Sequence, residues 1–156
     1  MRAWIIVVAR LYAGLMLLIY GFPKLVEPSD LLKSIRTYEI LPTQPPIYLN
    51  LSAVALPWLE ILAGLAILLS PLRRGASALS AIVLIVFTSA ILWRTFAIME
   101  ADGLAFTQIS FDCGCGSGEV IIWQKMIFNS SLIVACIVAG FSRRKNQPLT
   151  QPPAQP

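Results

Sequence analysis

Long hydrophobic runs separated by short polar segments dominate the pattern of this chain. Each run approaches or exceeds the about 20 apolar residues that an α-helix needs to cross the hydrocarbon core of a bilayer. No small-x-small cleavage site follows the first run, so we expect it to be an uncleaved span rather than a secretory signal. The pattern therefore predicts an all-α membrane protein with four transmembrane helices. The expected spans are residues 3–20, 49–69, 75–98 and 120–141.

The composition agrees with this interpretation. Hydrophobic residues make up 57% and charged residues 13% of the 156 residues, whereas a soluble domain has about 45–50% and about 25%. No basic run with interleaved aromatics indicates nucleic-acid binding. The absence of histidine excludes Ser-His-Asp chemistry and His-ligated zinc or haem. We expect one four-helix domain over residues 1–142, followed by a basic flank and a disordered Pro/Gln-rich tail over residues 143–156.

The charges between the runs predict an orientation. Arg73 and Arg74 lie between the second and third runs, and Arg143, Arg144 and Lys145 follow the fourth. The third loop, residues 100–119, holds four acidic residues and no basic one. Because cytoplasmic loops carry the excess of Lys and Arg, both termini are expected inside and the first and third loops outside. In a bacterium this places the protein in the cytoplasmic (inner) membrane, with those two loops in the periplasm.

The first outer loop is too long for a simple turn. Residues 31–38 have apolar side chains at helical spacing, which indicates a short interfacial helix. Tyr38 fits the aromatic belt at the level of the lipid headgroups. The charges of this loop are mixed, and Lys24 is expected among them.

Three polar residues fall within the predicted spans, namely Arg10, Glu60 and Asn129. A charge near the bilayer centre costs at least about 2.5–3.5 kcal/mol on insertion scales, so these side chains are expected to face the bundle interior. We expect Arg10 and Glu60 to form an ion pair, which either fixes helix register or serves a proton or quinone function. Arg94 and Lys125 lie nearer the outer ends, where they can snorkel to the interface and help to dock the acidic loop.

The segment Cys113-Gly114-Cys115 is the densest chemical signal in the chain. Two thiols separated by one glycine can close a small, strained disulfide, and strain makes a disulfide more oxidising. A structural disulfide remains an alternative, and so does a soft metal ion such as Cu(I). Zinc would require two further ligands, and no histidine or further external cysteine supplies them. Cys136 lies deep in the fourth span and is expected to be a packed apolar residue.

Several short motifs follow one another along the chain. They are Arg10 with Gly14, Gly21-Phe22-Pro23-Lys24-Leu25, Tyr38-Glu39-Ile40-Leu41-Pro42, Pro57-Trp58-Leu59-Glu60 with Gly64, Asp112-Cys113-Gly114-Cys115-Gly116, and Trp123 ahead of Asn129. In this order and spacing they resemble the MauE branch of the DoxX-like small membrane proteins over about residues 4–142. In place of the Phe-Gly that often follows the second cysteine in that family, this chain has Gly116-Ser117-Gly118.

The resemblance implies a role beside thiol chemistry at the outer face of the membrane. MauE proteins are linked to maturation of the disulfide-rich small subunit of methylamine dehydrogenase, beside a thioredoxin-like partner. We therefore expect Cys113 and Cys115 to act as a thiol–disulfide pair that exchanges electrons with a periplasmic thioredoxin-like protein or a client subunit. A quinone is a second expected partner. The alternatives are a non-catalytic accessory subunit of a quinone oxidoreductase complex with a structural disulfide, and a small-solute or proton pathway along an Arg10–Glu60 seam.

Overall fold

The computed structural model describes residues 2–38, 45–69, 71–112 and 118–141. Within these residues, four helices are long and apolar enough to cross a membrane. They are α1 (Arg2–Val26), α3 (Ile47–Leu69), α4 (Arg73–Asp102) and α5 (Ile122–Gly140). The predicted all-α fold with four transmembrane helices is therefore confirmed, and the lipid bilayer is its environment.

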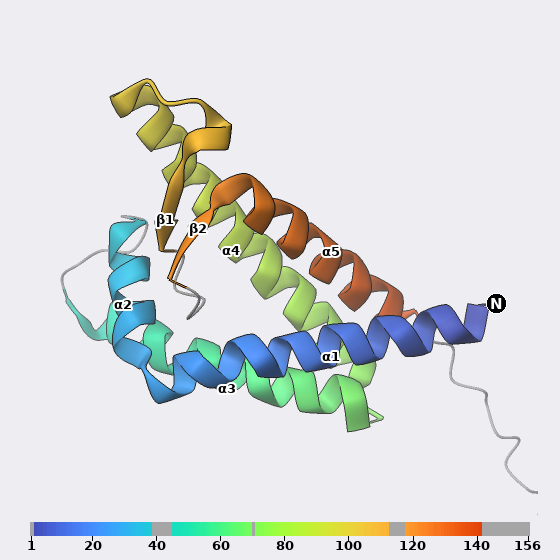
Figure 1. Cartoon of the computed structure of the whole chain (residues 1–156). Helices are drawn as coiled ribbons and strands as arrows, with labels where there is room; N and C mark the ends of the chain where they lie inside the picture. Colours follow the sequence, from blue (N-terminus) through green and yellow to red (C-terminus); the bar gives the residue numbers. More distant parts are fainter. Residues whose placement is uncertain (1, 39–44, 70, 113–117, 142–156) are drawn as a thin grey trace, which may run out of the picture.

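The helices form two pairs that diverge from one end of the molecule to the other. Figure 1 shows α1 beside α3 and α4 beside α5, close together at the end where α1 begins and α5 ends. Toward the opposite end the pairs separate. A short helix, α2 (Pro28–Thr37), and a small hairpin lie at that end. We call it the hairpin end, and the other the arginine end, because Arg73 and Arg74 begin α4 there.

Local chemistry explains where several elements begin and end. Pro28 occupies the start of α2, where its missing N–H would have no helical partner. Gly103 ends α4 with a φ of 65°, a left-handed conformation that glycine adopts without a Cβ clash. The strands β1 (Ser110–Asp112) and β2 (Glu119–Ile121) pair antiparallel, with Phe111 opposite Val120. Val120, expected in the fourth span, therefore belongs to a strand.

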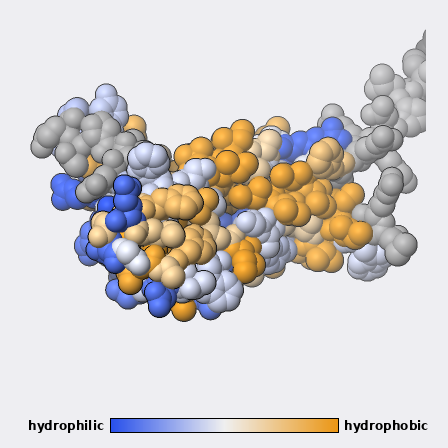
Figure 2. Space-filling view, turned by 90° about the horizontal axis from the view of Figure 1, so that it is seen from above, coloured by the Kyte–Doolittle hydropathy of each residue, from blue (hydrophilic) through white to orange (hydrophobic). Residues whose placement is uncertain are grey.

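The outside of the bundle is apolar, as a lipid-facing surface should be. Large side chains such as Trp4, Ile82, Val86 and Trp93 are 60% exposed or more. Figure 2 shows hydrophobic residues over most of one face, with hydrophilic residues gathered toward one end. Such a surface is stable against the hydrocarbon of a bilayer, whereas its exposure to water would be unfavourable. The protein is a multi-pass membrane protein.

Candidate functional site

Helices α1 and α3 approach each other closely, and glycines make the approach possible. A Cβ added to Gly64 would come 3.0 Å from the backbone oxygen of Gly14 and 3.2 Å from Cβ of Leu17. A Cβ on Gly21 would come 3.2 Å from Cβ of Glu60. Small residues allow helix backbones to approach in a membrane, where packing rather than water drives association. We call this contact the glycine seam.

A buried ion pair closes the glycine seam near the hairpin end. The ammonium of Lys24 lies 2.6 Å and 2.8 Å from the two carboxylate oxygens of Glu60. The two side chains are only 7% and 13% exposed. Because both carboxylate oxygens receive a charge-assisted hydrogen bond, the pair offsets much of the penalty for removing two charges from water.

The predicted pairing of Arg10 with Glu60 is therefore wrong. Arg10 instead donates to the carbonyl oxygens of Ile67 and Leu68, at 3.2 Å and 2.9 Å. These carbonyls belong to the last turn of α3, which has no helical N–H to bond them, and a cation is favoured there by the helix dipole. The two helices are antiparallel, and the start of α1 projects past the end of α3 (Figure 1). Arg10 consequently lies level with the end of α3, and Lys24 lies level with Glu60.

Glu60 and Asn129 line one small cavity in the bundle, and Lys24 and Lys125 line it too. Its volume is about 30 Å³, which is enough for a single water molecule. The Lys125 ammonium lies 5.0 Å from the ring centre of Tyr20, in cation–π range. With two ammonium groups and one carboxylate, the cavity lining carries a net positive charge.

A hydrogen bond joins α4 and α5 beside this cavity. Asn129 is 4% exposed and donates its amide to the hydroxyl of Thr88 at 3.0 Å. Thr88 in turn donates to the backbone oxygen of Leu84 at 2.6 Å. Asn129 therefore faces inward, as expected of a polar residue in a span. Of the three polar residues expected to face the bundle interior, Glu60 and Asn129 line this cavity and Arg10 does not. Arg94, which was expected nearer the outer ends, does not line it either.

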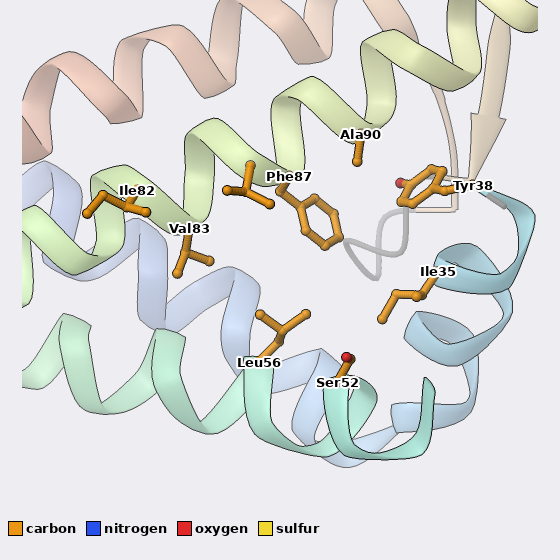
Figure 3. Close-up of a pocket in the computed structure, with 9 residues that line it drawn as sticks. Ile35, Tyr38, Ser52, Leu56, Ile82, Val83, Phe87 and Ala90 are labelled. Atoms are coloured by element: carbon orange, nitrogen blue, oxygen red, sulfur yellow. The ribbon is translucent and has the colours of Figure 1, made fainter. Parts of the chain in front are cut away.

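A larger, apolar pocket lies in the wedge between α2, α3 and α4. Its volume is about 330 Å³, within the range of small-molecule sites. Figure 3 shows Phe87 and Leu56 projecting into the space between α4 and α3, and Ile35 and Tyr38 on the side of α2. Phe87 also lines the polar cavity and lies 5.6 Å from the Lys24 ammonium. This one ring therefore separates the apolar pocket from the buried charges.

The hairpin packs against the same end of the bundle. Ile109, just before β1, and Ile122, just after β2, are buried with Tyr38 and Ile91. The rings of Tyr38 and Phe111 lie 6.3 Å apart. Tyr38 is 3% exposed, so it belongs to this core and not to a lipid-facing aromatic belt. These contacts fix the strands that flank residues 113–117.

Cys113 and Cys115 lie outside the described residues, so the prediction of a redox pair stays a prediction. Cys136 is fully buried beside Ala13, Ala81 and Ala135, which confirms its packing role. Thr88 and Phe87 were not identified from the sequence.

The inward position of Lys24 was also missed, because hydropathy places it after the first span. A signal for it exists. Lys24 continues the spacing of Arg10, Gly14, Leu17 and Gly21 along one helix face.

Comparisons with known proteins place the chain in one family. The family described as "Methylamine utilisation protein MauE" matches residues 2–142. A protein named "Methylamine utilization protein MauE" from Methylophilus methylotrophus is 32% identical over 107 residues, which is 69% of this chain and 50% of that relative. The chain thus spans about half the length of this curated relative. No solved structure matches. Because the family match covers nearly the whole chain, the chain belongs to the MauE family.

Proposed function

We propose that this protein supports periplasmic thiol–disulfide chemistry during maturation of a partner protein, as in the biogenesis of methylamine dehydrogenase. Family membership supports a membrane protein of methylamine utilisation. The observation that carries the finer proposal is the hairpin. Its strands bracket Cys113 and Cys115 in the sequence and are packed onto the bundle at the end away from Arg73 and Arg74.

The proposed exchange is balanced by two electrons and two protons. A thiolate of a periplasmic thioredoxin-like partner or of the client attacks a Cys113–Cys115 disulfide and forms a mixed disulfide. The second thiol of the partner then attacks the mixed disulfide and releases the cysteine of this chain. The partner leaves oxidised, and Cys113 and Cys115 leave reduced. The acidic neighbours Asp112 and Glu119 lie opposite each other across the hairpin, so a basic surface on the partner would complement them.

Cys113 and Cys115 need a two-electron acceptor to form their disulfide again. The apolar pocket fits a lipophilic acceptor. Its lining is aliphatic and aromatic apart from the hydroxyl-bearing Tyr38 and Ser52. The pocket lies between helices that face lipid, so a membrane-soluble quinone can reach it from the bilayer. When bound, a quinone supplies acceptor capacity for two electrons and two protons. Ile35, Leu56 and Phe87 would hold its ring, and Ser52 would orient a polar edge.

The decisive experiment is redox trapping in intact cells. A strain lacking the gene is complemented with the wild-type chain, with Cys113→Ser/Cys115→Ser and, as the matched control, with Cys136→Ala. Thiols are alkylated with a membrane-impermeant maleimide before lysis, and the client's disulfides are counted by mass spectrometry. We expect the double variant to lose client oxidation and the control to retain it.

Two results would contradict the proposal. One is a pair that stays wholly reduced or wholly oxidised whatever the state of the partner. The other is full complementation by the stably inserted double variant. The second result would favour the accessory-subunit alternative, in which the disulfide only holds the third loop. Maleimide labelling of single cysteines at residues 113 and 150 also tests the proposed topology, because only the first should react from outside.

A further inference from the structure

The arginine end of the bundle is rich in basic side chains, and the sequence places its Asp and Glu residues elsewhere. The chain has eight acidic residues, and none of them lies between residues 61 and 99 or after residue 119. Arg73 and Arg74 begin α4 at this end, and Arg10 lies on the neighbouring end of α3. In a membrane, such an excess of basic residues attracts the phosphates of anionic lipids.

Arg74 lies at the meeting point of two apolar grooves. One groove, of about 510 Å³, runs between α3 and α4 over Leu62, Ala66 and Leu79. The other, of about 260 Å³, runs between α4 and α5 over Ala78 and Ile137. Arg74 lines both of them, whereas Arg73 lines neither. Small residues make the grooves: Ala63, Ala66, Gly75 and Ala76 on one side, and Ala78, Ala81 and Gly140 on the other.

We propose that this end of α4 is a binding site for an anionic diacyl phospholipid. The phosphate bonds Arg74, and the two acyl chains descend in the two grooves on either side of α4. The guanidinium has five N–H donors, so it can bond a phosphate together with other partners. The occupant is a lipid rather than a soluble anion because the charged contact opens directly onto two apolar grooves on a lipid-facing surface.

The start of α4 adds to the attraction for a phosphate. Its N-cap residue, Leu72, provides no side-chain hydrogen bond, and the first turn has no acidic residue. Backbone N–H groups at a helix start point outward and carry partial positive charge, which favours an anion. The helix start and the Arg74 side chain therefore act on the same headgroup.

The test compares lipids of different charge and chain number on the purified, delipidated full chain in detergent. Phosphatidylglycerol is titrated against phosphatidylcholine, which has no net charge, and against lysophosphatidylglycerol, which has one acyl chain. Inorganic phosphate is the soluble probe. Bound lipid is counted by native mass spectrometry, and the midpoint of thermal unfolding is followed in parallel. We expect phosphatidylglycerol to bind most tightly and to raise the midpoint most.

Matched variants localise the effect. Arg74→Gln should weaken phosphatidylglycerol binding about fivefold, the equivalent of about 1 kcal/mol for one basic side chain at an anionic surface. Arg73→Gln removes the same charge one residue away and should change binding much less. Ala78→Phe narrows the α4–α5 groove and should make the diacyl lipid bind no better than the lyso-lipid. Ala97→Phe, on the exposed far part of α4, is its control.

Each other outcome overturns the proposal. Equal binding of phosphatidylglycerol and phosphatidylcholine would show that charge does not select the lipid. Equal losses in Arg73→Gln and Arg74→Gln would indicate diffuse attraction to an anionic surface rather than a site. Competition by inorganic phosphate at the same concentration as lipid would assign the site to a soluble anion. If Arg74→Gln does not fold, Arg74→Lys replaces it, since one ammonium keeps the charge but loses the bidentate geometry.

Discussion

Helix α3 contacts a partner on each side, and the two contacts differ sharply. Toward α1 the glycine seam brings backbones together, with Gly64 against the backbone of Gly14, and two cations bond groups of α3 across it. Toward α4, the same helix leaves one pocket at the hairpin end and one groove at the arginine end. The difference teaches that small and polar residues fix the pair α1–α3, while α3 and α4 leave space between them for lipophilic molecules.

The largest expected effect is the loss of one partner of the buried ion pair. Lys24→Met leaves the 13%-exposed carboxylate of Glu60 without its cation and should cost about 3–5 kcal/mol of unfolding free energy. Unfolding in mixed micelles of increasing SDS content, followed by tryptophan fluorescence, measures it. The double variant Lys24→Met/Glu60→Met should recover most of the loss. A double variant as unstable as the single one would show that the pair acts through packing alone.

The glycine seam gives the next largest effect. Gly64→Ala places a methyl group 3.0 Å from the backbone oxygen of Gly14, which cannot rotate away, and should cost roughly 1–3 kcal/mol. The matched control is Gly75→Ala, where no atom lies within 4 Å of the new Cβ. Because alanine favours a helix more than glycine does, the control should be neutral or more stable by up to about 1 kcal/mol. Equal losses of unfolding free energy in Gly64→Ala and Gly75→Ala would show that the glycine seam is packed no more tightly than the groove.

Filling the wedge should change stability less than filling a closed core. Ala90 lines the apolar pocket of about 330 Å³, so Ala90→Leu should stay within about 0.5 kcal/mol of the wild type. The same substitution at Ala13, which is fully buried, should cost about 1–3 kcal/mol. The same SDS titration compares them. A lipophilic quinone that raises the unfolding midpoint of the wild type should raise it less in Ala90→Leu.

The smallest effect is expected at the exposed ion pair of α2. Lys33 donates to Asp30 at 2.9 Å, with side chains 76% and 43% exposed, and such pairs add little to stability. The hydrogen bond with Asp30 raises the pKa of Lys33 above its ordinary value. The pair's contribution is therefore present below the ordinary lysine pKa and is lost as the pH rises through the raised one. Lys33→Ala should leave the midpoint at neutral pH unchanged, in contrast with Lys24→Met.

Hydropathy was sufficient for the number and type of the spans but not for their ends. The first helix continues past Tyr20 to Val26, because a membrane bundle tolerates Pro23 in its last turn and can bury Lys24 against Glu60. The fourth begins at Ile122, because the residues before it pair with β1. Both differences come from contacts between segments far apart in the chain, which a local window of sequence does not contain.

The sequence by itself determined that this is a four-span membrane protein with inward-facing Glu60 and Asn129, because the thickness of a bilayer and the cost of a buried polar group act on each segment separately. Only the tertiary structure decided which cation Glu60 meets. The answer depends on the axial offset between α1 and α3, which the glycine contacts set and hydropathy does not encode. Because of that offset, Lys24 pairs with Glu60 and Arg10 bonds the end of α3.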